Sequence, residues 1–451
     1  MKPVILREYD YLISESDGTI TGRQGERIAK GIPRKAFVYL GRLLSKDESR
    51  EQSDDHSFFL KRTSWQGKTA FQVQSFVGVL QTPCGTQIEI LPKTAKADDG
   101  NDYQASRRML IRMLRHLRDA NFKLGGDVHL KHDKMHLLEL FMGYFLREVN
   151  QLVKQGIRSD YITREENQMF LKGKLLVSQQ IRVNAIQQQR FYVAFDEYLP
   201  DRPENRLLHA ALEKVSRLTR TANNQRLCRE LEFVFADVPV SRDIPTDFSK
   251  CKFNRAMIHY RHALEWCRII LRGESAVPSA GKTKAISILF PMEKVFEDYV
   301  GWLLGRNLRV SYLKLQTTSK WLLEHPKKFQ MRPDFMFKMG SGGTVVGDAK
   351  WKLIDADASD GKLGVSQTDL YQLYAYGHKY LNGKGQLILF YPETDRFKKV
   401  IRWTFEDNLE IMLMPVPLSV ENKSKQNNVD LDCFLPQQNA QAQVEMLSES
   451  K

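Results

Sequence analysis

The sequence predicts an α+β protein of several domains: a β-rich N-terminal region, a mainly helical middle region and a C-terminal α/β domain with a mixed sheet. Three observations support this fold class. The chain has 451 residues, enough for two or three separate cores. Short strand-like runs dominate residues 1–95, whereas residues 103–275 carry apolar side chains at helical spacing. Between 285 and 415, helical and strand patterns alternate, which is typical of a sheet flanked by helices.

The N-terminal region, residues 1–95, is predicted to form its own β domain. Runs rich in β-branched and aromatic residues predict strands at 37–44, 58–65, 69–82 and 86–93. A charged stretch separates the first two runs, and the polar segment 96–102 is typical of a linker to the next domain.

The middle region, residues 103–275, is predicted as mainly helical with one strand pair, placed at 158–185 around Gly173. Gly156 follows a long apolar helix and is a typical C-cap. Helices are expected at 105–120, 135–156, 204–221, 225–234 and 253–272.

Two short strands joined by a Gly-rich turn carry the most informative residues of the chain. If the turn is centred on Ser341, an antiparallel hairpin places Asp334 opposite Asp348, because both lie seven residues from the centre. Lys350 then shares the face of the two aspartates, and a slip of one residue would destroy this arrangement.

Two carboxylates and a lysine on one face are the residue types that metal-assisted phosphodiester cleavage requires. Mg²⁺, or Mn²⁺ in its place, prefers oxygen ligands, and Asp334, Asp348 and the carbonyl of Ala349 are the expected ligands. Lys350 is expected to orient water or to stabilise charge on the phosphate. The alternative interpretation is a surface hairpin with ordinary acids.

Segments on either side of the hairpin supply two supporting residues, Glu297 and Gln372. A helix at 290–306 presents Glu297 as an accessory acid, although an exposed, solvated glutamate is about equally compatible with the pattern. A second helix at 366–380 places Gln372 and Tyr376 one turn apart on the same face. Strands are expected at 308–316, 386–391 and 399–404, and a polar loop at 354–364.

These motifs resemble the PD-(D/E)xK nuclease superfamily, with Asp334, Asp348 and Lys350 at the signature positions. Gln372 and Tyr376 match the Gln-x-x-x-Tyr element of its RecB-like branch. Together with the segments LKGKLLVSQQIRVN and FDEYLPDRPENRLLHAAL, the chain from about 70 to about 415 is similar to the McrC family, the nuclease subunits of McrBC modification-dependent restriction systems.

The resemblance implies a double-stranded DNA substrate that carries methylcytosine-type modification. It also implies an McrB-like AAA+ GTPase hexamer as partner, onto which the N-terminal and middle parts dock and whose GTP hydrolysis they stimulate. GTP is then bound by the partner and not by this chain. The Walker-like segment 276–283 agrees with this, because it lies in a linker and not between a strand and a helix.

The net charge and the cysteine content of the chain agree with this interpretation. A net charge of +14 favours a polyanionic partner. Five scattered cysteines, with no zinc spacing, fit a reducing compartment. We expect a cytoplasmic protein without a membrane partner, since no signal-peptide pattern or membrane-length apolar run is present. The tail 416–451 is polar and is predicted to be partly disordered.

Two other functions stay open at this point. One is a stand-alone RecB-like repair nuclease, which would cut DNA without an NTPase. The other is a non-catalytic regulator of an AAA+ ring, in which the acids serve only the fold.

Overall fold

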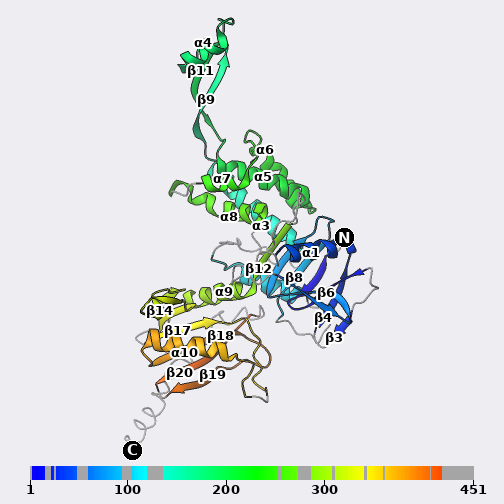
Figure 1. Cartoon of the computed structure of the whole chain (residues 1–451), viewed down its shortest axis with the longest axis vertical. Helices are drawn as coiled ribbons and strands as arrows, with labels where there is room; N and C mark the ends of the chain where they lie inside the picture. Colours follow the sequence, from blue (N-terminus) through cyan, green and yellow to red (C-terminus); the bar gives the residue numbers. More distant parts are fainter. Residues whose placement is uncertain are drawn as a thin grey trace, which may run out of the picture.

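The protein is described here from a computed structural model, in which the chain forms a series of compact units along one long axis (Figure 1). A sheet with its two helices lies at one end, the N-terminal sheets and a helical cluster follow, and a narrow arm projects at the other end. The structure describes residues 3–15, 22–24, 27–47, 59–93, 103–118, 136–251, 255–272, 286–306, 310–339, 343–358, 361–406 and 408–418.

The N-terminal part contains two sheets. The first has the strand order β3 (Gly22–Gln24), β4 (Arg27–Ile32), β2 (Tyr11–Ser14), β6 (Lys68–Val73) and β5 (Leu60–Trp65). The second has the order β1 (Val4–Arg7), β8 (Gln87–Leu91), β7 (Phe76–Gln81) and β12 (Ile286–Pro291).

One predicted strand in this part is wrong, because residues 37–44 lie inside helix α1 (Arg34–Asp47). Their apolar positions also fit a helical period. Ala36, Leu40 and Leu43 are buried on one face and pack into the N-terminal core. Pro33 directly precedes the helix, and its carbonyl accepts hydrogen bonds from the first turn.

Strand β12 lies far from β7 in the sequence yet pairs with it in antiparallel fashion. It therefore joins a sheet of the N-terminal part, although it falls in the segment predicted as C-terminal. Helix α9 (Met292–Arg306) begins at the residue that follows β12, and the Met292 N–H still donates to the Ser75 carbonyl at 3.0 Å. The polypeptide thus passes from one unit to the next without a linker.

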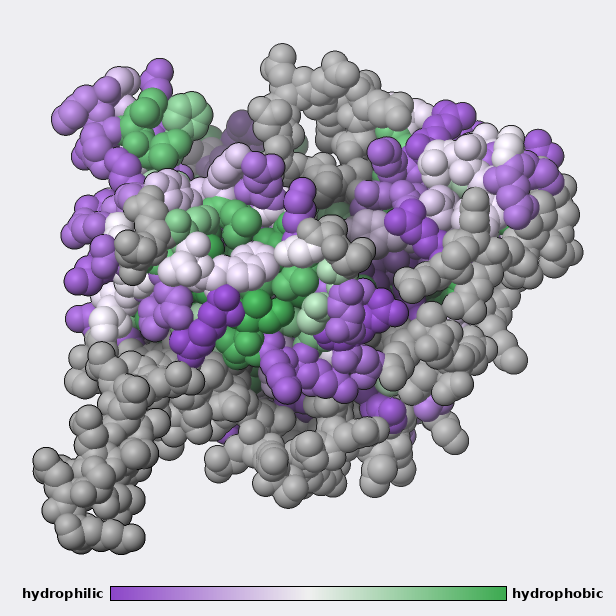
Figure 2. All heavy atoms as spheres, turned by 90° about the horizontal axis from the view of Figure 1, so that it is seen from below, coloured by the Kyte–Doolittle hydropathy of each residue, from purple (hydrophilic) through white to green (hydrophobic). Residues whose placement is uncertain are grey.

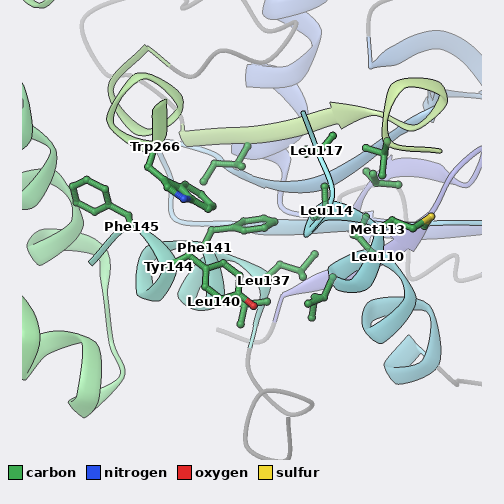
Figure 3. Packing of buried hydrophobic residues seen from close by; sticks show 14 of the residues in the cluster. Leu110, Met113, Leu114, Leu117, Leu137, Leu140, Phe141, Tyr144, Phe145 and Trp266 are labelled. Atoms are coloured by element: carbon green, nitrogen blue, oxygen red, sulfur yellow. The ribbon is translucent and has the colours of Figure 1, made fainter. Parts of the chain in front are cut away.

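The middle part is a cluster of helices, as the apolar periodicity predicts. Helix α3 (Leu137–Gln155) is its centre, and Phe141, Tyr144 and Trp266 form an aromatic contact inside it (Figure 3). Gly156 ends α3 with φ of 93°, which confirms the expected C-cap. The other helices are α2 (Tyr103–Leu114), α5 (Pro203–Leu218), α6 (Ala222–Val234), α7 (Ile244–Lys250) and α8 (Arg261–Arg272), with a 3-10 turn, η3 (Arg255–Tyr260).

The arm that projects from this cluster is an antiparallel pair of nine-residue strands, β9 (Asp160–Gln168) and β11 (Phe191–Leu199) (Figure 1). A short strand, β10 (Lys174–Leu175), and a helix, α4 (Val177–Asn184), lie near its tip. The predicted pair around Gly173 is therefore wrong in its partners: β9 and β10 each pair with β11 and not with each other.

The C-terminal part is a mixed six-stranded sheet between two helices. Its central strands β17 and β18 are parallel, β16 and β17 are antiparallel, and α9 and α10 (Gln367–Leu381) cover opposite faces. Strand order across the sheet is β13 (Val310–Leu315), β16 (Phe335–Met339), β17 (Thr344–Ala349), β18 (Gly385–Pro392), β20 (Leu409–Val416) and β19 (Ile401–Glu406). A small hairpin, β14 (Lys320–Leu323) and β15 (Lys328–Met331), stands beside it.

The fold is thus α+β, in agreement with the predicted class. Seen from below, hydrophilic residues surround a more apolar central area of the surface (Figure 2). None of the helices in the described ranges combines the length and the hydropathy that crossing a bilayer requires. The Walker-like segment 276–283 and the predicted tail beyond 418 lie outside the described residues.

Candidate functional site

The predicted hairpin register is confirmed. Strands β16 and β17 pair with Met336 opposite Val346 and Phe335 opposite Gly347, so that Asp334 and Asp348 fall on one line across the hairpin. The alternate side chains form the expected core face, since Phe335, Phe337, Val345, Ala349 and Trp351 are buried together against α9. The acid face is covered as well, because Val346 packs into a second apolar cluster beneath α10.

Asp334 lies just before β16 and turns its carboxylate towards the end of β17. Its Oδ2 accepts a hydrogen bond from the backbone N–H of Ala349 at 2.8 Å. Burial, together with the negative charges of Asp348 and Glu297, raises the pKa of Asp334 to about 8. Asp348 and Glu297 are therefore close enough for their negative charges to act on the buried carboxylate of Asp334.

Asp348 is almost fully buried, with 3% of its surface exposed. Its carboxylate forms an ion pair with the ammonium group of Lys350. Burial lowers the pKa of Lys350, but the carboxylate of Asp348 more than offsets this and holds that pKa above its usual value. The ammonium group of Lys350 is therefore charged and lies against the carboxylate of Asp348.

Helix α10 positions the lysine through a short relay of hydrogen bonds. The Nζ of Lys350 donates to Oε1 of Gln372 at 3.0 Å, and Nε2 of Gln372 donates to the hydroxyl of Tyr376 at 2.8 Å. The i, i+4 spacing that the sequence shows thus places both side chains beside the hairpin.

Glu297 comes near the same region but is already engaged. Its Oε1 accepts from Nε2 of Gln316 at 2.7 Å and forms an ion pair with Arg118, a residue just beyond helix α2. Arg118 also donates its backbone N–H to Asp298 at 3.0 Å. Glu293, another acid of helix α9, is exposed.

The donor set suits a hard divalent cation, but it is not arranged as a complete ligand cage. Within the described ranges, no three His, Cys, Asp or Glu side chains are gathered as ligands for one ion. Asp334 and Asp348 offer carboxylate oxygens, which Mg²⁺ prefers, and the negative charges of Asp348 and Glu297 add to the effect of burial in raising the pKa of Asp334. The residues present fit one ion held by two carboxylates and completed by backbone oxygen and water.

Sequence reasoning missed three participants. Asp369 of α10 is 7% exposed and pairs with Lys352 at 2.6 Å, and its charge also acts on Lys350. Gln316 and Arg118 come from segments in which the sequence carries no catalytic pattern. Of these three residues, only Asp369 could have been predicted from the sequence, because it lies in the first turn of a helix that faces the hairpin.

The fold and the site define a class: a multidomain α+β protein whose C-terminal mixed sheet displays two aspartates and a lysine on a hairpin. The family model described as "McrBC 5-methylcytosine restriction system component" matches residues 71–392, which is more than half of the chain. The chain belongs to this family of McrBC-type restriction-system subunits. The resemblance that the sequence motifs indicated is thereby confirmed.

Solved structures show a similar fold. A chain in the tetradecameric assembly of Thermococcus gammatolerans McrB AAA+ hexamers with bound McrC has a TM-score of 0.65 and 21% identity, over 94% of this chain and 98% of that one. A chain of the Thermococcus gammatolerans McrBC complex has 22% identity and a TM-score of 0.47, over 68% of this chain and 88% of that one. None of the curated proteins gives a significant match.

Proposed function

We propose that this chain is the DNA-cutting subunit of an McrBC-like restriction complex. It is a Mg²⁺-dependent endonuclease that cleaves DNA with methylcytosine-type modification. Its C-terminal sheet has the PD-(D/E)xK nuclease fold. It works with an AAA+ GTPase hexamer that binds GTP and whose GTP hydrolysis it stimulates. The observation that carries the proposal is the alignment of Asp334, Asp348 and Lys350 on one hairpin.

Asp334 and Asp348, with the carbonyl of Ala349, would hold the ion. When bound, Mg²⁺ polarises the phosphoryl group and makes an attacking water more acidic. Lys350, kept in place by Gln372, donates hydrogen bonds to a phosphate oxygen and offsets the charge that develops there. Glu297 adds negative charge beside the ion, and the net charge of +14 attracts the DNA backbone.

The exposed side chains of the arm support the part of the proposal that concerns the AAA+ partner. Helix α4 is fixed to the arm by amides: Asn184 and Asn167 bond to each other twice at 2.9 Å, and Oε1 of Gln180 accepts from the Tyr192 N–H at 2.6 Å. Its apolar side chains are therefore free to face outwards. Ile181 is 68% exposed and Ile186, just beyond the helix, is 94% exposed.

Other exposed apolar side chains lie near this tip: Met169, Phe170, Leu171, Val177 and Val183. Tyr161 and Tyr198, which lie opposite each other at the other end of the strand pair, are exposed as well. Apolar residues gathered on a projecting element mark a protein-binding surface. The AAA+ ring that the McrC-like fold implies is the partner we assign to it.

Cleavage and GTPase stimulation are separable tests of the proposal. The chain is purified with an McrB-like AAA+ GTPase from the same organism, and methylated and unmethylated DNA are incubated with Mg²⁺ and GTP. We expect Asp348→Asn and Lys350→Ala each to lower the cleavage rate by about 10²–10³-fold or more, because each removes a charge from the reacting centre. Stimulated GTP hydrolysis should stay at the wild-type rate.

Asp355→Asn is the matched control, since Asp355 is an acid of the same domain that pairs with Arg396 away from the hairpin. It should cut at the wild-type rate. Full cleavage by both site variants would show that the site assignment is wrong. Cleavage by the wild-type chain without partner or GTP would favour the stand-alone repair nuclease, and GTPase stimulation without any cleavage would favour the regulator.

A further inference from the structure

Trp351, the residue that follows the lysine of the hairpin, is held by the N-terminal part of the chain. Its indole Nε1 donates to both carboxylate oxygens of Glu8, at 3.1 and 2.9 Å. Glu8 follows strand β1 and stands 343 positions away in the sequence. Both side chains are buried, so the contact is an internal part of the structure.

Two further residues of the N-terminal sheets complete the contact. Ser75 donates its hydroxyl to Oε1 of Glu8 at 3.1 Å, and Lys93 donates its backbone N–H to Oε2 at 3.0 Å. The ammonium group of Lys93 in turn donates to the Trp351 carbonyl at 3.1 Å. The N-terminal part thus holds both the side chain and the backbone of the residue next to Lys350. We call Glu8, Ser75, Lys93 and Trp351 the clasp.

The clasp uses a group that is costly to bury. Burial raises the pKa of Glu8 to about 7, even though Lys93 and the hydrogen bonds from Trp351 and Ser75 act in the opposite direction. An apolar contact would join two domains at lower cost in free energy, because a buried carboxylate must recover its lost hydration through every bond it makes. Hydrogen bonds, unlike apolar packing, depend on direction, so they fix the position of the Trp351 indole relative to Glu8.

Trp351 also touches the helix that carries the accessory acid. Its ring lies 5.2 Å from that of Phe296, the neighbour of Glu297 on α9. A shift of the indole would therefore move two parts of the site: the Asp348–Lys350 segment on one side and the Glu297 turn on the other.

We propose that Glu8 is a positioning residue for the cutting site, acting through Trp351, so that the N-terminal sheets are a required part of the nuclease. This inference rests on the nuclease function proposed above. It adds that cleavage depends on a contact outside the C-terminal sheet, made by residues that touch neither DNA nor metal.

The test compares Glu8→Ala and Glu8→Gln in the full complex, at a temperature where circular dichroism shows every variant folded. We expect Glu8→Ala to lower kcat for DNA cleavage by about tenfold, since small displacements of reacting groups have effects of this size or larger. KM for DNA and GTPase stimulation should change by less than about twofold. Glu8→Gln should recover most of the rate, because its amide oxygen still accepts from the indole.

Asp10→Asn is the matched control. Asp10 is a buried acid two residues along, and it accepts backbone bonds from Arg7 at 2.8 Å and Ile28 at 3.0 Å within the N-terminal sheets. It should lower thermal stability without a specific loss of kcat. If Asp10→Asn loses kcat as Glu8→Ala does, or if Glu8→Ala cuts at the wild-type rate, the positioning role is wrong.

A second variant keeps the test open if Glu8→Ala does not fold. Trp351→Phe retains a ring against Phe296 but lacks the N–H donor, so it should show the same fall in kcat. Adding Glu8→Gln to Trp351→Phe should then change kcat by less than about twofold, because no indole N–H is left for residue 8 to accept. Cleavage by Trp351→Phe at the wild-type rate would contradict the proposal. A wild-type complex that does not cut at all would instead overturn the nuclease function itself.

Discussion

The hairpin β16–β17 and the arm β9–β11 are both antiparallel strand pairs, but they have opposite surroundings. The hairpin lies between two apolar layers, with Phe335 and Phe337 on one side and Val346 on the other. The strands of the arm project from the body (Figure 1). Apolar side chains at its tip are exposed. A reacting centre needs groups held in place away from bulk water, whereas a binding surface must stay accessible.

The interactions that stabilise the hairpin differ from those that stabilise the arm. Each large apolar side chain buried around the hairpin contributes about 1.5–3 kcal/mol. The arm depends on backbone hydrogen bonds and on amides such as Asn184 and Gln180, each of which contributes about 0.5–1.5 kcal/mol net. Changes in the arm are therefore expected to affect binding, and changes around the hairpin to affect the whole fold.

Among the changes that test this comparison, charging the tip of the arm should have the largest effect. Ile181→Asp combined with Ile186→Asp should weaken assembly with the AAA+ partner by about 30-fold or more, the loss of a binding hot spot worth about 2 kcal/mol. Titration calorimetry with the partner measures this. Gln188→Asp, which adds charge at an exposed polar position of the same tip, should bind normally. If the double variant binds the partner with wild-type affinity, the arm is not the docking surface.

Two glycines give a smaller and more direct comparison. In Gly347→Ala the new Cβ would lie 2.8 Å from Cε2 of Phe390, inside the packed sheet. We expect a loss of about 1–3 kcal/mol in the free energy of unfolding, seen as a lower Tm of the whole chain. In Gly173→Ala, at φ of +72°, the Cβ would lie 2.4 Å from the Ala194 carbonyl oxygen.

Because Gly173 belongs to the arm, its substitution should open the arm alone. Hydrogen exchange should rise in β9 and β11 while the main Tm is unchanged. Equal losses of Tm in the two variants would mean that the arm and the sheet unfold as one unit.

The last expected effect is a dependence of stability on pH. The folded-state pKa of Asp334, about 8, lies above its ordinary value of 3.8, so the folded chain holds a proton that the unfolded chain releases. The stability that this proton supports is complete below pH 3.8 and is lost as the pH rises through 8. Mg²⁺ should oppose this loss, because it stabilises the ionised carboxylate.

Thermal unfolding between about pH 5 and pH 9, with and without Mg²⁺, measures this slope. Glu8, whose pKa is raised to about 7, contributes in the same direction, so Asp334→Asn is compared with the wild type and should show a shallower slope. The same slope in both proteins would contradict the assigned cause.

The hairpin could be predicted from the sequence because its information is local. Asp334 and Asp348 are equidistant from one turn, and the alternation that places Phe335 and Phe337 on the face opposite Asp334 allows one register. Gln372 and Tyr376 were predictable for the same reason, since helical spacing places them on one face. Short-range periodicity is sufficient for such elements.

Long-range contacts could not be predicted in this way. Nothing in the local pattern shows that Glu8 meets Trp351, that Arg118 pairs with Glu297, or that β12 joins β7. The helix at 37–44 was mistaken for a strand because a short apolar run fits both periods. Pairing partners depend on tertiary packing, which a single sequence does not display.

The junction between β12 and α9 has a mechanical consequence. Because the ladder with β7 runs to Pro291 and the helix begins at Met292, any rotation of the C-terminal sheet against the N-terminal sheets must first break a backbone hydrogen bond. A force applied to the N-terminal sheets is therefore passed directly to helix α9 and, through it, to the C-terminal sheet.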